Sequence, residues 1–124
     1  MNDKTAKLCI PPTCSILEAI KVLDETHERI VLIEEDGILL GVLTDSDVRK
    51  WILKNGDMTE KVTEVMTRQP ISVTWENRAL AVRLMQRHGI DAIPVLDGGG
   101  RLLDIQFRYE TPEKKKHSGE KTTA

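Results

Sequence analysis

The sequence contains few aromatic residues and few cysteines. Two tryptophans, one tyrosine and one phenylalanine make up 3% of its 124 residues, so aliphatic side chains must build the hydrophobic core. Cys9 and Cys14 are the only cysteines, and no cluster of further cysteines or histidines completes the four ligands of a zinc site. The composition therefore excludes a fold held by several disulfides or by structural zinc. It favours reduced cysteines in the cytoplasm.

Long apolar runs and concentrated positive charge are lacking as well. The chain has no run of about 18 apolar residues, so we expect no transmembrane helix. Residues 1–7 lack the apolar stretch of a signal peptide. The net charge of −2 at pH 7 argues against a nucleic-acid surface, which needs a concentrated basic face. We therefore expect a cytoplasmic protein that binds neither nucleic acid nor a membrane.

A pattern of aliphatic runs and turns occurs twice in the chain. In each copy an aliphatic run is followed by a glycine-containing turn and by a second aliphatic run. Glu34 matches Asp97 and Gly37 matches Gly100, which is an offset of 63 positions in both cases. Each copy predicts a strand, a helix and two further strands joined by a turn. The first copy adds a second helix over residues 46–53.

The helix of the first copy has a clear start signal. Ser15 is a candidate N-cap residue, and Glu18, three positions later, is its capping-box partner. In the second copy, Glu76 and Asn77 are expected to begin the matching helix. The apolar face of the first helix is expected to comprise Ile16, Leu17, Ile20 and Leu23, and that of the second Leu80, Leu84 and Met85, with Val82 at its margin.

Three segments carry a resemblance to a known family. Residues 41–48 have a glycine, two apolar residues and a threonine, followed three positions later by an aspartate. With residues 62–67 and 85–97, in this order and spacing, they resemble a pair of cystathionine-β-synthase (CBS) domains, also called a Bateman module. The resemblance implies an α/β (α+β) fold of two βαββ(α) repeats related by a pseudo-twofold axis. The repeats are expected at 1–56 and 64–110, with a linker at 57–63 and a polar, disordered tail at 111–124.

The same resemblance implies a ligand site for an adenine nucleotide of the AMP, ADP or ATP class. Thr44 and Asp47 are the expected ribose contacts, because a hydroxyl donates and accepts hydrogen bonds and a carboxylate accepts from both ribose hydroxyls. Val42 would flank the adenine. The remaining expected ligand-binding residues are Arg29, as a partner for phosphate, and Asp91 and Pro94, which border the cleft by resemblance. The alternative for residues 44–47 is that they cap the helix that follows.

The second copy departs from this binding pattern. With the offset of 63, Gly41 maps to Asp104, Thr44 to Phe107 and Asp47 to Glu110. A phenylalanine ring cannot form a hydrogen bond with a ribose, so we expect at most one good nucleotide site. Packing in the core is the favoured role for Phe107.

The functional hypothesis is a regulatory ligand-binding module that works as a homodimer and requires no cofactor. No nucleophile–base set is recognisable, so we expect no enzymatic activity. A narrower resemblance to the CBS pairs that precede sugar-nucleotidyltransferase domains implies such an enzyme as the regulated partner. The alternative is a ligand-free dimerisation module. By resemblance, the helix that contains Trp51 would form the dimer face, and Trp51 would either lie at that interface or pack within the module.

Overall fold

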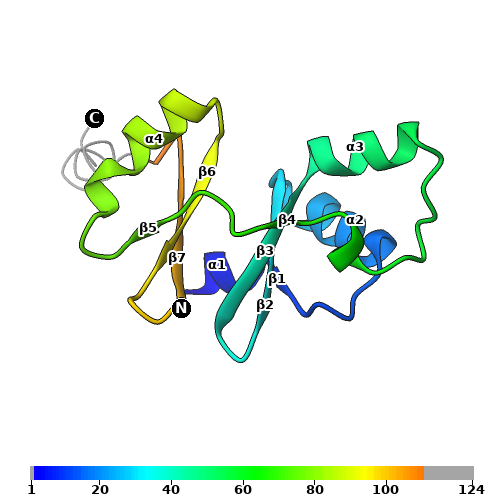
Figure 1. Ribbon diagram of the computed structural model, residues 1–124, viewed down its shortest axis with the longest axis horizontal. Coiled ribbons are helices and arrows are strands. Elements are labelled where there is room, and N and C mark those ends of the chain that lie inside the picture. Colours follow the sequence, from blue (N-terminus) through cyan, green and yellow to red (C-terminus); the bar gives the residue numbers. More distant parts are fainter. Residues whose placement is uncertain (1, 111–124) are drawn as a thin grey trace.

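The structure is a computed structural model and describes residues 2–110 (Figure 1). The tail predicted over residues 111–124 lies outside the described residues. The elements are α1 (Asp3–Ala6), β1 (Cys9–Ile10), α2 (Ile16–Thr26), β2 (Ile30–Glu35), β3 (Ile38–Thr44), α3 (Asp45–Leu53), η1 (Val62–Glu64), β4 (Thr67–Arg68), β5 (Val73–Thr74), η2 (Arg78–Leu80), α4 (Ala81–His88), β6 (Ala92–Leu96) and β7 (Leu102–Phe107). The strands form a four-stranded sheet in the order β1-β2-β3-β4 and a three-stranded sheet in the order β5-β6-β7. Mixed α/β architecture is thereby confirmed.

Both sheets repeat one pairing scheme. In the first, β1 runs parallel to β2 with Cys9 beside Leu32, and β2 is antiparallel to β3. In the second, β5 runs parallel to β6 with Val73 beside Val95, and β6 is antiparallel to β7. Figure 1 shows the sheets adjacent in the middle of the molecule, with α2 and α3 outside one of them and α4 outside the other. The predicted strand, helix, strand, strand order is present in each unit.

Helix α2 begins as its sequence predicts. The Ser15 hydroxyl oxygen accepts a hydrogen bond from the Glu18 N–H at 3.1 Å, and the Glu18 carboxylate accepts one from the Ser15 N–H at 2.8 Å. Both free N–H groups are thereby satisfied. Ile16 and Ala19 are fully buried on the inner face. The placement of Leu17 on that face was wrong, since its side chain is 46% exposed.

The matching helix of the second unit begins later than predicted. Helix α4 starts at Ala81 and is preceded by the single 3₁₀ turn η2, while the side chain of Asn77 forms no capping hydrogen bond. A 3₁₀ turn has three residues per turn, so it changes the phase of the apolar face relative to an α-helix. Leu80 is consequently 45% exposed, and Ala81 and Met85 are the buried residues of the helix.

The two units exchange short segments. Strand β4, which follows the predicted linker, pairs with β3 of the first sheet, with Gly41 beside Arg68 and Val42 beside Thr67. Helix α1 at the beginning of the chain contacts the second sheet, where the Thr5 hydroxyl donates a hydrogen bond to Asp104 at 2.9 Å. The first sheet is therefore completed by β4, from the segment between the two units, and the second sheet is contacted by α1, from the beginning of the chain.

Three clusters of buried residues form the core. One lies under α2 and α3, one lies under α4, and the third joins the two sheets. The joining cluster is formed by Leu8, Ile30, Leu32, Val42, Leu102, Ile105 and Phe107. Phe107 is only 3% exposed, which confirms its role in the core. Among residues 2–110, no helix has both the length and the apolar character needed to cross a membrane.

Candidate ligand-binding cleft

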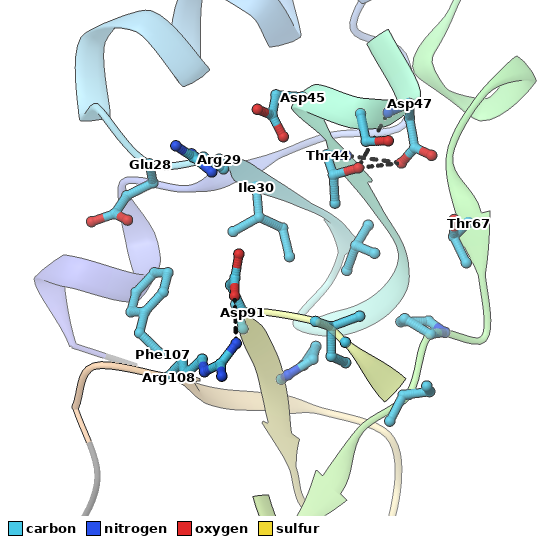
Figure 2. Close-up of a pocket in the computed structure, with 18 of the residues that line it drawn as sticks. Glu28, Arg29, Ile30, Thr44, Asp45, Asp47, Thr67, Asp91, Phe107 and Arg108 are labelled. Carbon is cyan, nitrogen blue, oxygen red and sulfur yellow. Dashed lines mark hydrogen bonds and ion pairs between the residues drawn. The ribbon is translucent and has the colours of Figure 1, made fainter. Parts of the chain in front are cut away.

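An open cleft of about 990 Å³ lies where the two units meet (Figure 2). Its volume is at the upper end of the range of small-molecule sites. One wall comes from the start of β2 and from the junction of β3 and α3. The opposite wall comes from β6 and from the end of β7, and the segment after β4 closes one side. The lining side chains that carry polar groups are His27, Glu28, Arg29, Thr44, Asp45, Ser46, Asp47, Thr67, Gln69, Asp91, Arg108 and Tyr109.

All six residues expected to bind ligand line this cleft. Val42, Thr44 and Asp47 belong to β3 and the first turn of α3, and Arg29 directly precedes β2. Asp91 directly precedes β6, and Pro94 lies within it. The structure therefore brings together residues that are up to 65 positions apart in sequence, from Arg29 to Pro94.

The junction of β3 and α3 is a complete capping box. The Thr44 hydroxyl accepts a hydrogen bond from the Asp47 N–H at 3.2 Å and donates one to Asp47 Oδ2 at 3.0 Å. Asp47 Oδ2 also accepts from the Thr44 N–H at 2.9 Å. The capping role that was left open is therefore present. Within the described residues, Asp47 Oδ1 takes part in no hydrogen bond, so this carboxylate can cap the helix and still accept hydrogen bonds from a ligand.

The opposite wall is formed by the end of β7. Arg108 donates its N–H to the Asp91 carbonyl oxygen at 2.8 Å, and its guanidinium lies 3.6 Å from the Asp91 carboxylate. Figure 2 shows this pair facing the Thr44–Asp47 junction across the cleft. The Tyr109 hydroxyl donates to Glu28 at 3.3 Å. Partial burial and the Glu28 charge raise the pKa of Tyr109 to about 12, so the hydroxyl remains a donor at neutral pH.

The charges of the lining are mixed. Its acidic side chains are Glu28, Asp45, Asp47 and Asp91, and its permanently charged cations are Arg29 and Arg108. The carboxylates suit the hydroxyl groups of a sugar, and the arginines suit a phosphate or carboxylate group. Among residues 2–110 there is no group of three or more cysteine, histidine or acidic side chains placed to hold a metal ion.

Sequence reasoning missed Arg108 at the end of β7 and the residues of β4 and of the segment after it. Arg108 and Tyr109 follow the aromatic residue that replaces Thr44, and the repeat offset was the only signal that the end of β7 lies at the cleft. Thr67 ends the segment at residues 62–67 that carries part of the resemblance, whereas Gln69 and Ile71 come from a stretch with no motif of its own. They line the cleft because β4 joins the first sheet, which is a long-range pairing.

The CBS domain family model matches residues 4–54 and 79–105 of this chain. Among curated proteins, the chain is similar to the arabinose 5-phosphate isomerase GutQ of Salmonella typhi, with 34% identity over 101 residues that make up 77% of this chain and 32% of the isomerase. It is also similar to the inosine-5'-monophosphate dehydrogenase of Mycobacterium tuberculosis, with 36% identity over 102 residues, or 77% of this chain and 18% of the dehydrogenase. The chain thus spans a third or less of these relatives.

Solved CBS domain structures show the same fold. The CBS domain protein PAE2072 from Pyrobaculum aerophilum, complexed with AMP, has a TM-score of 0.78 and 17% identity, covering 98% of both chains. CBSX2 in complex with AMP has a TM-score of 0.74 and 25% identity, covering 92% of this chain and 91% of that one. The MJ0100 CBS pair with 5'-methylthioadenosine and S-adenosyl-L-methionine has a TM-score of 0.74 and 24% identity, covering 90% and 88%.

Proposed function

Since the chain belongs to the CBS domain family and forms a CBS pair, we propose that it is a regulatory module that binds an adenine nucleotide in the cleft between its units. The observation that carries this proposal is the convergence of Val42, Thr44, Asp47, Arg29, Asp91 and Pro94 on one cleft of ligand size. Structures of the same fold contain AMP or S-adenosyl-L-methionine, which supports an adenosine-containing ligand. No cofactor is part of the proposal.

Each part of an adenine nucleotide has a matching surface in the cleft. The ribose hydroxyls would donate to Asp47, whose Oδ1 is available, and the adenine would lie against the apolar surface of Val42 and Pro94. The phosphate would be bound by Arg29 or Arg108 and by the N-terminal end of α3, where the helix dipole favours an anion. Such a ligand contacts both units, so it can favour one relative arrangement of the units over another.

The regulated partner is proposed from the relatives. The matched region makes up 32% of GutQ and 18% of the dehydrogenase, both of which are enzymes. We propose that this module acts on an attached or associated cytoplasmic enzyme. These two relatives are an isomerase and a dehydrogenase rather than a sugar nucleotidyltransferase, so the narrower resemblance stays a prediction.

Isothermal titration calorimetry tests the binding proposal. The full chain at about 0.1 mM would be titrated with AMP, ADP, ATP and S-adenosylmethionine, which detects dissociation constants up to the millimolar range. We expect heat from at least one adenine nucleotide, with one molecule bound per chain. The absence of heat with all four compounds would overturn the proposal.

A second candidate function is association of two modules without ligand. It is favoured by apolar side chains on the outer surface of α2 and α3, where Leu17, Ile52 and Leu53 are 46%, 51% and 81% exposed. Homodimer formation through this surface is also compatible with ligand binding. Analytical ultracentrifugation measures the dimer directly. Two results together would favour this second function alone. The Asp47→Asn variant would still form a dimer, and no nucleotide would change the melting temperature of the wild-type protein.

A further inference from the structure

The second unit has residues equivalent to Gly41, Thr44 and Asp47. Residues from the beginning of the chain pack against these equivalents. The counterparts of Gly41, Thr44 and Asp47 at an offset of 63 are Asp104, Phe107 and Glu110. The first turn of the chain, residues 2–7, contacts all three of them. We call residues 2–7 the N-terminal latch.

The latch forms two hydrogen bonds with Asp104. The Thr5 hydroxyl donates to Asp104 Oδ1 at 2.9 Å, and the Asn2 side-chain amide donates to the same oxygen at 3.2 Å. Thr5 is fully buried, and its N–H donates to the Asn2 side-chain oxygen at 2.8 Å, which caps the turn. Burial opposes ionisation of Asp104, but hydrogen bonds from the Ile105 N–H and these two side chains hold its pKa below the usual value.

Lys4 joins the latch to the other two counterparts. Its ammonium group lies 2.5 Å from the Glu110 carboxylate and 5.3 Å from the centre of the Phe107 ring. Lys4 and Glu110 are both partly buried, with side-chain exposures of 31% and 23%, so water screens their charges less than at an open surface. A cation over an aromatic face is also attracted by the ring.

The equivalent segment of the first unit behaves differently. Lys4 corresponds to Thr67, which lies in the extended strand β4 beside Val42, and the next residue, Arg68, lies beside Gly41. A side-chain carbon at Gly41 would lie 2.8 Å from both Met66 Sδ and the Thr67 carbonyl oxygen, so only glycine admits the strand there. Asp104, in the place of Gly41, instead accepts hydrogen bonds from a helical turn. The first position, at Gly41, Thr44 and Asp47, therefore stays open to a ligand. The second position, at Asp104, Phe107 and Glu110, is occupied by the latch.

The segment that the latch contacts also forms a wall of the ligand cleft. Phe107, Arg108 and Tyr109 line the cleft, and Glu110 follows them directly. We propose that the N-terminal latch occupies the second position of the CBS pair, holds residues 107–110 in place, and is thereby coupled to ligand binding in the first position. A wall that is ordered before the ligand arrives lowers the entropic cost of binding, so an intact latch strengthens binding. The ligand part of this statement rests on the proposed function.

Hydrogen exchange tests the latch without any ligand. The Lys4→Met variant keeps the length of the side chain and removes its charge, and Lys7→Met is the matched control in the same turn, where the lysine is exposed. We expect the N–H groups of Arg108 and Glu110, which donate to Asp91 and Phe107, to exchange about fivefold faster in Lys4→Met and at the wild-type rate in Lys7→Met. Unchanged exchange in Lys4→Met would overturn the proposal.

Calorimetry with AMP tests the coupling. Lys4→Met should raise the dissociation constant of AMP about fivefold, at the lower end of typical coupling between sites, and Lys7→Met should leave it unchanged. Glu110→Gln removes the same ion pair from the other partner and should match Lys4→Met. If wild type binds AMP and Lys4→Met binds it equally well, the coupling is wrong. If wild type binds no nucleotide, the proposed function fails, and the exchange rates still decide whether the latch exists.

Discussion

The two units share a backbone plan but differ in the chemistry at the end of their last strand. In the first unit β3 ends at Thr44, and Thr44 and Asp47 together cap α3 and face an open cleft. In the second unit β7 ends at Phe107, and Phe107 and Glu110 both contact the ammonium group of Lys4. The aliphatic core positions recur at a fixed offset, whereas Gly41, Thr44 and Asp47 of the first copy are replaced by Asp104, Phe107 and Glu110 in the second.

The largest difference concerns stability. Phe107 is 3% exposed and packs between the sheets, so Phe107→Ala should lower the free energy of unfolding by about 3–5 kcal/mol. Thr44→Ala at the equivalent position removes a capping side chain and should cost about 1 kcal/mol. Urea unfolding of both variants measures the difference. An equal loss of unfolding free energy in both variants would contradict the assignment of Phe107 to the core and of Thr44 to the cleft.

Nucleotide binding should show the opposite asymmetry. Asp47→Asn removes the charge of a carboxylate that we propose accepts from the ribose hydroxyls, and hydrogen bonds to a charged group contribute about 1.5–3 kcal/mol. We therefore expect a loss of affinity of about 10–100-fold by calorimetry. Glu110→Gln, the matched change in the second unit, should cost only about fivefold, through the latch. A greater loss in Glu110→Gln would place the nucleotide in the second position instead.

A smaller asymmetry is expected at the helix starts. Ser15 completes a capping box on α2, so Ser15→Ala should lower the free energy of unfolding by about 1 kcal/mol. Asn77 forms no capping hydrogen bond through its side chain, so Asn77→Ala should change it by less than about 0.5 kcal/mol. Thermal unfolding monitored by circular dichroism compares the two variants. A cost at Asn77 as large as that at Ser15 would contradict the late start of α4.

The smallest effect concerns pH. Burial raises the pKa of Asp104, but hydrogen bonds from the Ile105 N–H, Thr5 and Asn2 lower it below the ordinary value of an aspartate, so the ionised form stabilises the fold at pH values above that ordinary value. This contribution is lost as the pH falls through the folded pKa. Gly41, at the equivalent position, has no titrating group. Between pH 5 and pH 2, wild type should therefore lose more stability than Asp104→Asn, as measured by urea unfolding. Parallel curves for the two proteins would show that the latch does not depend on this charge.

Local signals in the sequence predicted the parts of the fold that local interactions determine. The capping box at Ser15 and the glycine turns of both hairpins depend on residues three or four positions apart. The start of α4 was predicted wrongly, because a single 3₁₀ turn shifts the apolar phase and has no strong composition signal. Strand β4 and helix α1 were missed, because pieces of two and four residues show no periodicity.

The six expected ligand-binding residues converge on one cleft because they lie in or directly beside β2, β3, α3 and β6, which line it. Whether each of them contacts a ligand is a proposal that the Asp47→Asn experiment begins to test. The part of the opposite wall at the end of β7 could not be predicted in the same way, since Arg108 and Tyr109 reach the cleft through the packing of one sheet on the other. Contacts between segments far apart in the sequence produce no local sequence pattern from which they could be predicted.

The ion pair between Lys4 and Glu110 also has a topological consequence. It joins side chains 106 positions apart, so the described chain enters and leaves the fold at neighbouring places. A module of this kind can be inserted into a surface loop of a host protein without forcing the ends of that loop apart. A short peptide that connects residue 110 to residue 2 would likewise allow circular permutation, with new ends opened in the turn at residues 98–100.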